Sequence, residues 1–316
     1  MTKKIAVLGA NGRIGLTVVT VFHKAGWSVV AVTRKGQFSG IEAVENQSAD
    51  AHSLVDLKEA VSGCDVVFNG LNPLYHRWHD EAIPLAKNVI AACLESGATH
   101  LFPGNLYNYG YDIPEKITPN TPKHGGTKKG HIRVQMESLF ERAANSQGLQ
   151  TITVRAGDFS GGAGTGSWFD LTITSQFQKG KVVYPGDRSL PHAWAYLPDL
   201  SRAFVTLAEK RTECQPFDEF LFEGFTLTGQ ELHTLLEEAA KQPLKKSSIP
   251  WTLFRIGALF NPVWRETLEI RYLWDTPHAL DGGKLANFCP DFVSTSPDVA
   301  FKEALEDLNL LSSPNP

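Results

Sequence analysis

The chain has 316 residues, of which 42% are hydrophobic and 20% charged, so it can bury a large core as one or two domains. Its net charge of −4 gives no reason to expect nucleic acid or an acidic membrane surface as a partner. No apolar run approaches the roughly 20 residues that span a bilayer, and the four cysteines lie far apart, as is typical of thiols in a reducing cytoplasm.

The N-terminal segment predicts a strand, a glycine-rich turn, a helix and a second strand. Residues 3–8 are mostly apolar, the turn 9–15 (GANGRIG) follows at once, and apolar residues then recur at helical spacing as far as Gly26. A second apolar run covers 27–32. This order predicts the first unit of a doubly wound parallel sheet.

The three glycines of this turn indicate a bound dinucleotide. Their spacing lets the backbone turn tightly off the strand and approach a pyrophosphate, and Gly15 lets the helix pack against the strand. The helix N-terminus would supply N–H donors and a partial positive charge to the phosphates. A purely structural turn is the alternative.

The residues after the second strand bear on which dinucleotide is bound. NAD enzymes normally place Asp or Glu there to bind the ribose 2′-hydroxyl, whereas this chain has Thr33, Arg34 and Lys35. Arg34 could bind a 2′-phosphate, helped by Arg13 in the turn. We therefore predict NADP, with NAD as the other candidate; the alternative is a solvated basic pair on a loop.

The spacing G-x-x-G-x-x-G resembles the extended and atypical short-chain dehydrogenase/reductase superfamily, which includes NAD(P)-dependent epimerases and dehydratases. The resemblance implies an α/β Rossmann fold, a doubly wound parallel sheet with helices on both faces and a small C-terminal α+β substrate lobe. We expect 1–160 to form the dinucleotide-binding domain, with further elements from about 181–223, and 161–316 to form the interleaved substrate lobe.

The later segments continue the alternation of strands and helices. Strands are predicted near Val44 and over 65–71, 98–103, 150–155 and 217–223, and helices over 54–62, 81–96, 127–147 and 199–210. Farther on, a capping-box pattern at 228–231 predicts the start of a helix, and residues 249–251 resemble the family's last strand. Two apolar helices are predicted over 254–260 and 263–274. The final helix is capped by residues 296–298, and we expect a frayed tail over 312–316.

The region expected to carry the chemistry departs from the family. Extended members usually have Ser or Thr four residues before a Tyr-Gly pair, and here that position is Asn105, whose amide can still hydrogen-bond a substrate oxygen. The signature Tyr-x-x-x-Lys is also replaced. When the helix is aligned on Glu137, Lys129 occupies the position of the family's Tyr and Arg133 the position of its Lys. The tyrosine that usually acts as the acid is therefore missing.

Lys129 and Arg133 are four residues apart, so they share one helix face, which we expect to point toward the nicotinamide ribose. Lys129 could be a general acid/base if burial beside Arg133 favours its neutral amine. Alternatively, both are cations that bind ribose or an anionic substrate, or they belong to a solvated basic turn. Tyr107 and Tyr109 are phenols that could replace the lost acid.

Other candidates come from the resemblance and from loop position. Asp50 could face the adenine or cap a helix, and Trp168 could be a lid residue or a buried anchor. His76 and His79 lack a third partner at a recognisable spacing, so we predict no metal site. The complete set is: catalytic Asn105, Lys129 and Tyr107; cofactor-binding Gly9, Asn11, Gly12, Arg13, Ile14, Gly15, Arg34, Asp50, Gly70, Leu71, Asn72, Gly104, Arg133, Ala156 and Gly157; substrate-binding Trp78, Trp168 and His192.

The leading hypothesis is a cytoplasmic NADP-dependent oxidoreductase, or an epimerase/dehydratase-like enzyme, that acts on a small polar carbonyl or carbinol. Asn105 would orient the reacting oxygen, Lys129 would transfer the proton and Arg133 would bind ribose. The rival hypothesis is a non-catalytic NADP-binding sensor, and a third keeps the cofactor bound for a redox-neutral reaction. A homodimer through helices 81–96 and 127–147 would follow the superfamily's habit.

Overall fold

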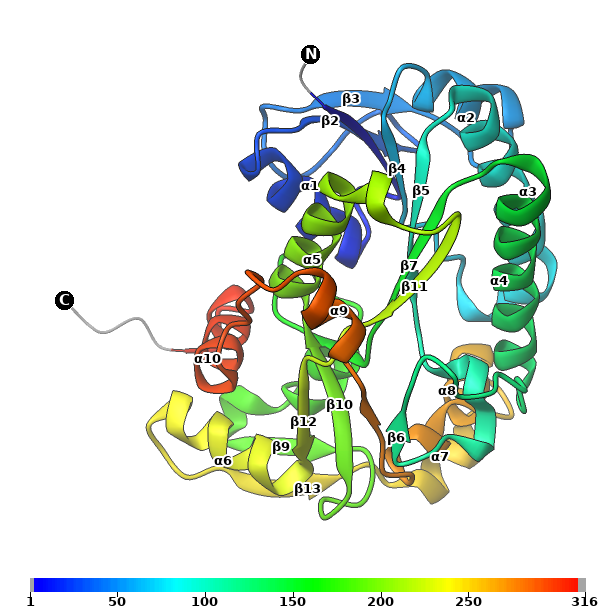
Figure 1. Cartoon of the computed structure of the whole chain (residues 1–316). Helices are drawn as coiled ribbons and strands as arrows, with labels where there is room; N and C mark the ends of the chain where they lie inside the picture. The colour runs from blue at the N-terminus through cyan, green and yellow to red at the C-terminus, as the bar shows by residue number, and fades with distance from the viewer. Residues whose placement is uncertain (1–2, 312–316) are drawn as a thin grey trace.

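The computed structural model describes residues 3–311, and the predicted tail from Ser312 lies outside them. A seven-stranded parallel sheet runs through the larger lobe in the order β11-β7-β5-β4-β1-β2-β3 (Figure 1). This is the predicted doubly wound fold. The strands are β1 Lys4–Leu8, β2 Ser28–Thr33, β3 Glu45–Ser48, β4 Val66–Asn69, β5 Thr99–Gly104, β7 Thr151–Arg155 and β11 Phe217–Leu221.

Helices cover both faces of this sheet, so its inner strands are apolar on both sides. Successive residues of β1 alternate between the two faces: Ile5 and Val7 pack toward α1 and α5, and Ala6 and Leu8 pack toward α2, α3 and α4. The edge strand β3 is polar and mostly exposed. The helices are α1 Arg13–Lys24, α2 Leu54–Val61, α3 Trp78–Ser96, α4 Lys128–Gln147 and α5 Leu197–Glu209.

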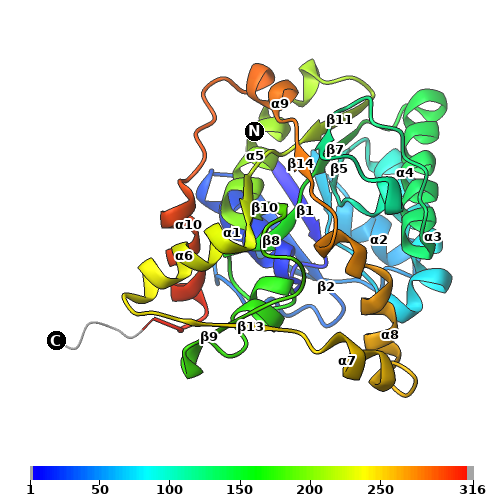
Figure 2. The ribbon, with the colours of Figure 1, turned by 90° about the horizontal axis from the view of Figure 1, so that it is seen from below.

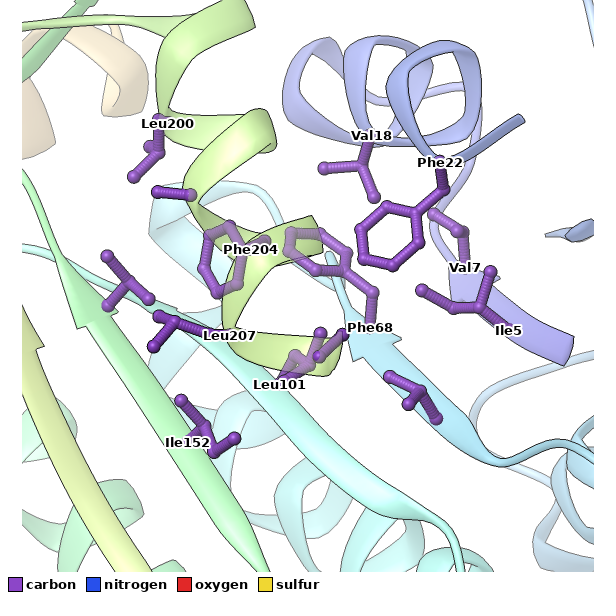
Figure 3. Packing of buried hydrophobic residues seen from close by; sticks show 14 of the residues in the cluster. Ile5, Val7, Val18, Phe22, Phe68, Leu101, Ile152, Leu200, Phe204 and Leu207 are labelled. Carbon is purple, nitrogen blue, oxygen red and sulfur yellow. The ribbon is translucent and has the colours of Figure 1, made fainter. Parts of the chain in front are cut away.

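The face under α1 and α5 shows how the sequence pattern becomes a core (Figure 3). Val18 and Phe22 of α1 lie on the same side as Leu200, Phe204 and Leu207 of α5 and meet the strands below them. The rings of Phe68 and Phe204 meet edge to face, 5.0 Å apart. This packing brings Phe68 and Phe204, which are 136 positions apart, into one layer.

The smaller lobe lies beyond the carboxyl ends of the large sheet (Figures 1 and 2). Its sheets are β12-β10-β8, β13-β9 and β14-β6, and its core surrounds Trp194 and Phe301. Its elements are β6 Lys116–Ile117, β8 Asp158–Ser160, β9 Lys181–Tyr184, β10 Pro191–Tyr196, β12 Phe225–Thr228, β13 Lys245–Ser248, β14 Ala279–Leu280, α6 Gly229–Ala240, α7 Trp251–Gly257, α8 Pro262–Glu269 and α10 Pro297–Asp307. Helix α9 Gly283–Phe288 instead packs against β11 of the large lobe.

Several C-terminal predictions need correction. The strand expected at 249–251 is β13, which ends three residues earlier at Ser248, because Pro250 is the N-cap of helix α7. The apolar helix expected over 263–274 ends at Glu269 and is followed by a separate 3-10 turn, Arg271–Trp274. The capping box at Thr228 and Glu231 is present as predicted.

The lobes interleave in the chain. Of the region 181–223 that we expected to contribute to the dinucleotide domain, α5 and β11 lie in the large lobe. The earlier strands β9 and β10 instead belong to the small sheets. The chain therefore returns to the large lobe at Leu197, immediately after Tyr196 ends β10.

Candidate functional site

A deep cleft of about 2020 Å³ separates the carboxyl edge of the large sheet from the smaller lobe. In an open α/β sheet this edge is where ligands bind. Most predicted site residues line it: Gly9, Asn11, Gly12, Arg13, Ile14, Arg34, Asp50, Gly70, Leu71, Asn72, Trp78, Gly104, Asn105, Tyr107, Arg133, Ala156, Gly157 and Trp168. Gly15, Lys129 and His192 are not part of the lining.

The glycine-rich turn is built from close backbone approaches. Gly9 has a φ of +72°, and a Cβ there would lie 2.9 Å from the carbonyl oxygen of Gly70 at the end of β4. A Cβ on Gly15 would lie 2.4 Å from the Gly9 carbonyl oxygen, so Gly15 acts through packing and not through the cleft. No larger residue fits at either position without moving the backbone.

The N-terminus of α1 is open toward the cleft. Gly12 is its N-cap and offers no capping side chain, and the first turn carries no acidic residue. The first N–H groups of the helix are therefore available to an anion, with the helix dipole behind them. The turn thus fits the pyrophosphate of a dinucleotide.

Asn11 fixes the neighbouring loop between β2 and β3. Its side-chain amide donates to the Gln37 carbonyl oxygen at 2.7 Å, and its Oδ1 accepts from the Ser39 N–H at 3.0 Å. Arg34 lies on this side of the cleft, is exposed, and forms no ion pair with any residue of the described chain. Its guanidinium is therefore available to a ligand phosphate.

Arg13 is engaged differently from our expectation. Its guanidinium donates to the Asp170 carboxylate at 2.6 Å and to the carbonyl oxygens of Gly164 at 3.0 Å and Gly161 at 3.1 Å. Arg13 therefore binds the loop after β8 and does not stand free beside Arg34. The neighbouring sequence could not reveal this partner, which is 157 positions away.

Asp50 lies on the cleft just before α2, but it is not the cap of that helix. Ser53 is the N-cap and accepts from the Asp56 N–H, while the Asp50 carboxylate accepts from the His52 N–H at 3.0 Å. The capping alternative for Asp50 is therefore wrong. An adenine contact stays a prediction.

Arg133 is the most unusual charge in the cleft. Arg133 is only 8% exposed. Its guanidinium carbon lies 4.8 Å from the centroid of the Trp78 ring and 5.1 Å from that of the Phe102 ring. It forms no ion pair or hydrogen bond with the described residues, and its Nε is buried without a partner. Burial lowers the pKa of Arg133, and an unpaired buried cation of this kind calls for a ligand.

Lys129 faces a different partner, which corrects the expectation that it and Arg133 share one environment. Its ammonium pairs with Glu266 and, at 2.9 Å, with Glu269, both on α8. Glu269 also accepts the Lys129 backbone N–H at 2.8 Å. These contacts assign Lys129 to holding α8 against the start of α4.

Two phenols and an amide side chain are joined by hydrogen bonds at the cleft. The hydroxyls of Tyr75 and Tyr107 are 2.8 Å apart, and burial raises the pKa of both, that of Tyr107 well above its usual value. The Oδ1 of Asn105 accepts the Tyr107 N–H at 3.1 Å, which leaves the Asn105 NH₂ to donate elsewhere. All three residues line the cleft.

Glu137, on which the helix was aligned, has a structural role. Arg155 is fully buried and donates to Glu137 at 2.6 Å and through its Nε to Glu219 at 2.7 Å. These pairs raise the pKa of Arg155 despite its burial. The network ties α4, β7 and β11 together below Asn105, whose backbone carbonyl also accepts from Arg155.

Sequence reasoning missed Tyr75, Asp158 and His278, which also line the cleft. Tyr75 lies in the loop after β4, where ligands were expected, and Asp158 directly follows the predicted contact Gly157, so both had a positional signal. His278 had none, because distant segments hold it at the cleft: β14 pairs with β6, and the His278 N–H donates to the Pro191 carbonyl oxygen of β10. Among the described residues, no cluster of three or more His, Cys, Asp or Glu could hold a metal ion.

Comparison with solved structures supports the fold. UDP-N-acetylglucosamine 4-epimerase from Bacillus cereus is 15% identical, with a TM-score of 0.75 over 99% of both chains. UDP-glucose 4-epimerase from Brucella ovis in complex with NAD is 14% identical, with a TM-score of 0.74 over 96% of this chain and 97% of that one. MoeE5 in complex with UDP-glucuronic acid and NAD is 16% identical, with a TM-score of 0.76 over 97% and 99%.

These similarities confirm the expected fold, which this chain shares with the nucleotide-sugar epimerases. None of the curated proteins matches the chain significantly. Within residues 3–311, no helix is long and apolar enough to cross a membrane. The NmrA-like family model matches residues 1–281, so the chain belongs to the NmrA-like family.

Proposed function

We propose that this protein is an NADP(H)-dependent oxidoreductase that acts on an uncharged carbonyl or carbinol compound. The observation that carries the proposal is Arg133, a buried guanidinium with no counterion among the described residues, in the lining of a cleft that also includes the glycine-rich turn. Such a group is costly to bury unless a ligand completes its hydrogen bonds.

The cofactor part of the proposal depends on how the residues fit. The α1 N-terminus and the tight turn at Gly9 would receive the diphosphate, and Arg34 would pair with a ribose 2′-phosphate. Arg133 would bind the hydroxyls of the second ribose. When bound, the nicotinamide supplies a hydride donor or acceptor.

The chain's own groups would handle the substrate oxygen. The Asn105 NH₂ is free to donate to a carbonyl oxygen, and Tyr107 holds its proton at the hydroxyl, shared with Tyr75 at 2.8 Å. The stacked arginine carries positive charge beside these phenols. An oxygen that gains negative charge would be stabilised by this arrangement.

The smaller lobe argues against a nucleotide sugar as the substrate. Its part of the cleft lining, from Thr165 to His278, contains no Lys or Arg. A sugar nucleotide carries a diphosphate, which proteins bind with cations or helix N-termini. We therefore favour an uncharged substrate over the sugar-nucleotide epimerase reaction.

Fluorescence titration with NADPH and NADH tests the proposal, after a check for copurified cofactor. NADPH should bind more tightly, and NADPH absorbance should fall with time in the presence of a panel of uncharged ketones and aldehydes. Binding of NADPH without consumption of any carbonyl would favour the sensor instead. The raised pKa of Tyr107 is an argument for that alternative, because a phenol with a high pKa is a weak general acid near neutral pH. Failure of both cofactors to bind rejects the oxidoreductase and the sensor together.

A further inference from the structure

Asp158 is placed in the cleft by a close contact between two strands. It begins β8, which runs parallel to β10, and the preceding Gly157 has no room for a side chain: a Cβ there would lie 2.2 Å from the Ala193 carbonyl oxygen. This approach brings the Asp158 carboxylate to 2.8 Å from His192, whose Nε2–H donates to it. His192 is buried and stacks on Trp274 at 4.0 Å, so the carboxylate is held in one direction.

His278 supplies a second acceptor beside it. Its ring lies edge-on to that of His192, with centroids 4.5 Å apart, and its Nδ1–H donates to the Thr276 carbonyl oxygen at 2.9 Å. Burial lowers the pKa of His278 to about 3. The ring is therefore neutral near pH 7, and its Nε2 carries a lone pair.

Aromatic side chains form the walls on the smaller-lobe side. Trp168, Phe254 and Trp264 line the cleft, and the rings of Phe254 and Trp264 stack 4.5 Å apart at an interplanar angle of 11°. An apolar, flat ligand would gain most from such walls. No cation of the smaller lobe lines this space to offset a charged ligand.

The two sides of the cleft therefore have opposite hydrogen-bonding character. Asn105 and the Tyr75–Tyr107 pair, on the large lobe, can donate. Asp158 and His278, on the small lobe, can only accept. The Asp158 carboxylate has no proton to donate and already accepts from His192, and the one N–H of the His278 ring is already bonded to the Thr276 carbonyl oxygen. A ligand that joins the lobes needs an acceptor at one end and a donor at the other.

We propose that Asp158 and His278 form a donor-selecting subsite, and that the substrate is an uncharged, largely apolar carbonyl compound that also carries a hydroxyl group. The carbonyl oxygen meets Asn105, and the hydroxyl donates one bifurcated hydrogen bond that Asp158 and His278 share. This inference rests on the proposed oxidoreductase function and adds the substrate class. His192 is a positioning residue, because it reaches the cleft only through Asp158.

Calorimetric titration tests the subsite without requiring turnover. The probes are 2-naphthol, its methyl ether 2-methoxynaphthalene, which cannot donate, and UDP-glucose, each added at pH 6.5 to the protein saturated with NADPH. We expect 2-naphthol to bind about tenfold or more tightly than the ether, the usual gain from a hydrogen bond to a charged acceptor. UDP-glucose should bind more weakly than either.

Two variants locate the effect. Asp158→Asn keeps an oxygen that can accept from His192, and His278→Phe keeps the ring, so both should fold; each should reduce the preference for 2-naphthol to about threefold or less. His124→Phe, at an exposed histidine outside the cleft, should keep the full preference. Circular dichroism and melting temperature verify folding, and NADPH affinity should stay unchanged in all three.

Equal binding of 2-naphthol and its ether, or tighter binding of UDP-glucose, would overturn the subsite while leaving NADPH binding, and with it the cofactor part of the proposed function, intact. If both Asp158→Asn and His278→Phe keep the full preference for 2-naphthol over its ether, the hydroxyl donates to some other group, and the proposed subsite is equally overturned. Loss of NADPH binding to the native protein would instead reject the proposed function itself.

Discussion

The Arg13 guanidinium in the glycine-rich turn donates to the Asp170 carboxylate of the smaller lobe at 2.6 Å, and both side chains are almost fully buried. The same carboxylate accepts from the N–H groups of Gly166 and Ser167. One ion pair therefore connects the turn that would hold the diphosphate with the glycine-rich loop that carries Trp168. We therefore expect the binding of a cofactor at the turn and the position of this loop to depend on each other.

Asp170→Ala should destabilise the protein by about 3 kcal/mol, because it leaves a buried arginine without its counterion. Urea unfolding measures the change in the free energy of unfolding. Proteolysis within 161–168 should also become faster. Asp291→Ala, at an exposed carboxylate outside the cleft lining that has no hydrogen bond or ion pair with the described residues, is the control and should change neither quantity. A change below about 0.5 kcal/mol in Asp170→Ala would mean that the pair is not maintained in solution.

Arg34→Ala should weaken NADPH binding by about 1–3 kcal/mol, the typical loss of a hydrogen bond between charged groups, and leave NADH nearly unaffected. Titration of both cofactors measures the difference. Lys35→Ala is the matched control at the adjacent cation and should have a smaller effect, since Arg can bind a phosphate with two parallel hydrogen bonds. Equal losses for NADPH and NADH would show that Arg34 does not bind the 2′-phosphate.

The parts of this fold that follow from short-range patterns could be predicted, and the parts that depend on distant partners could not. Apolar runs, the glycine spacing and the capping box are local, which explains why the large sheet and the strand–turn–helix order at its start were expected correctly. The spacing of Lys129 and Arg133 puts them on one side of α4, but it cannot show that Glu266 and Glu269, some 140 residues later, cover the first turn. The same limit applies to Arg13 and to His278.

Acidification should destabilise the fold through His100. Burial lowers the pKa of His100 to about 3 from an ordinary value of 6.5, and its Nε2 accepts from the Asn69 amide at 3.2 Å. Between these two values the unfolded chain binds the proton and the folded chain does not, so the free energy of unfolding falls as the pH is lowered from about 6.5 toward 3.

The loss from this one residue is at most about 1.4 kcal/mol per pH unit. His100→Gln keeps an amide that can pair with Asn69 but cannot titrate, so its unfolding free energy should fall less steeply over the same pH range. Urea unfolding at half-unit pH steps gives both slopes. Replacement of the exposed His124 by Gln should leave the slope as in the native protein. Parallel slopes for His100→Gln and the native chain would contradict the assignment.

Substitutions of Lys129 can distinguish a role in proton transfer from a role in positioning α8. If it holds α8 through Glu266 and Glu269, Lys129→Arg should keep both ion pairs and retain turnover with any carbonyl substrate found in the screen. Lys129→Met should leave two half-buried carboxylates unpaired and expose Arg255 and Arg265 of the α7–α8 segment to faster cleavage by trypsin. NADPH affinity should stay the same in both, because Lys129 does not line the cleft. If Lys129 is the acid/base, Lys129→Arg should abolish turnover, since a guanidinium does not give up its proton near neutral pH, and it should do so without any change in the trypsin pattern.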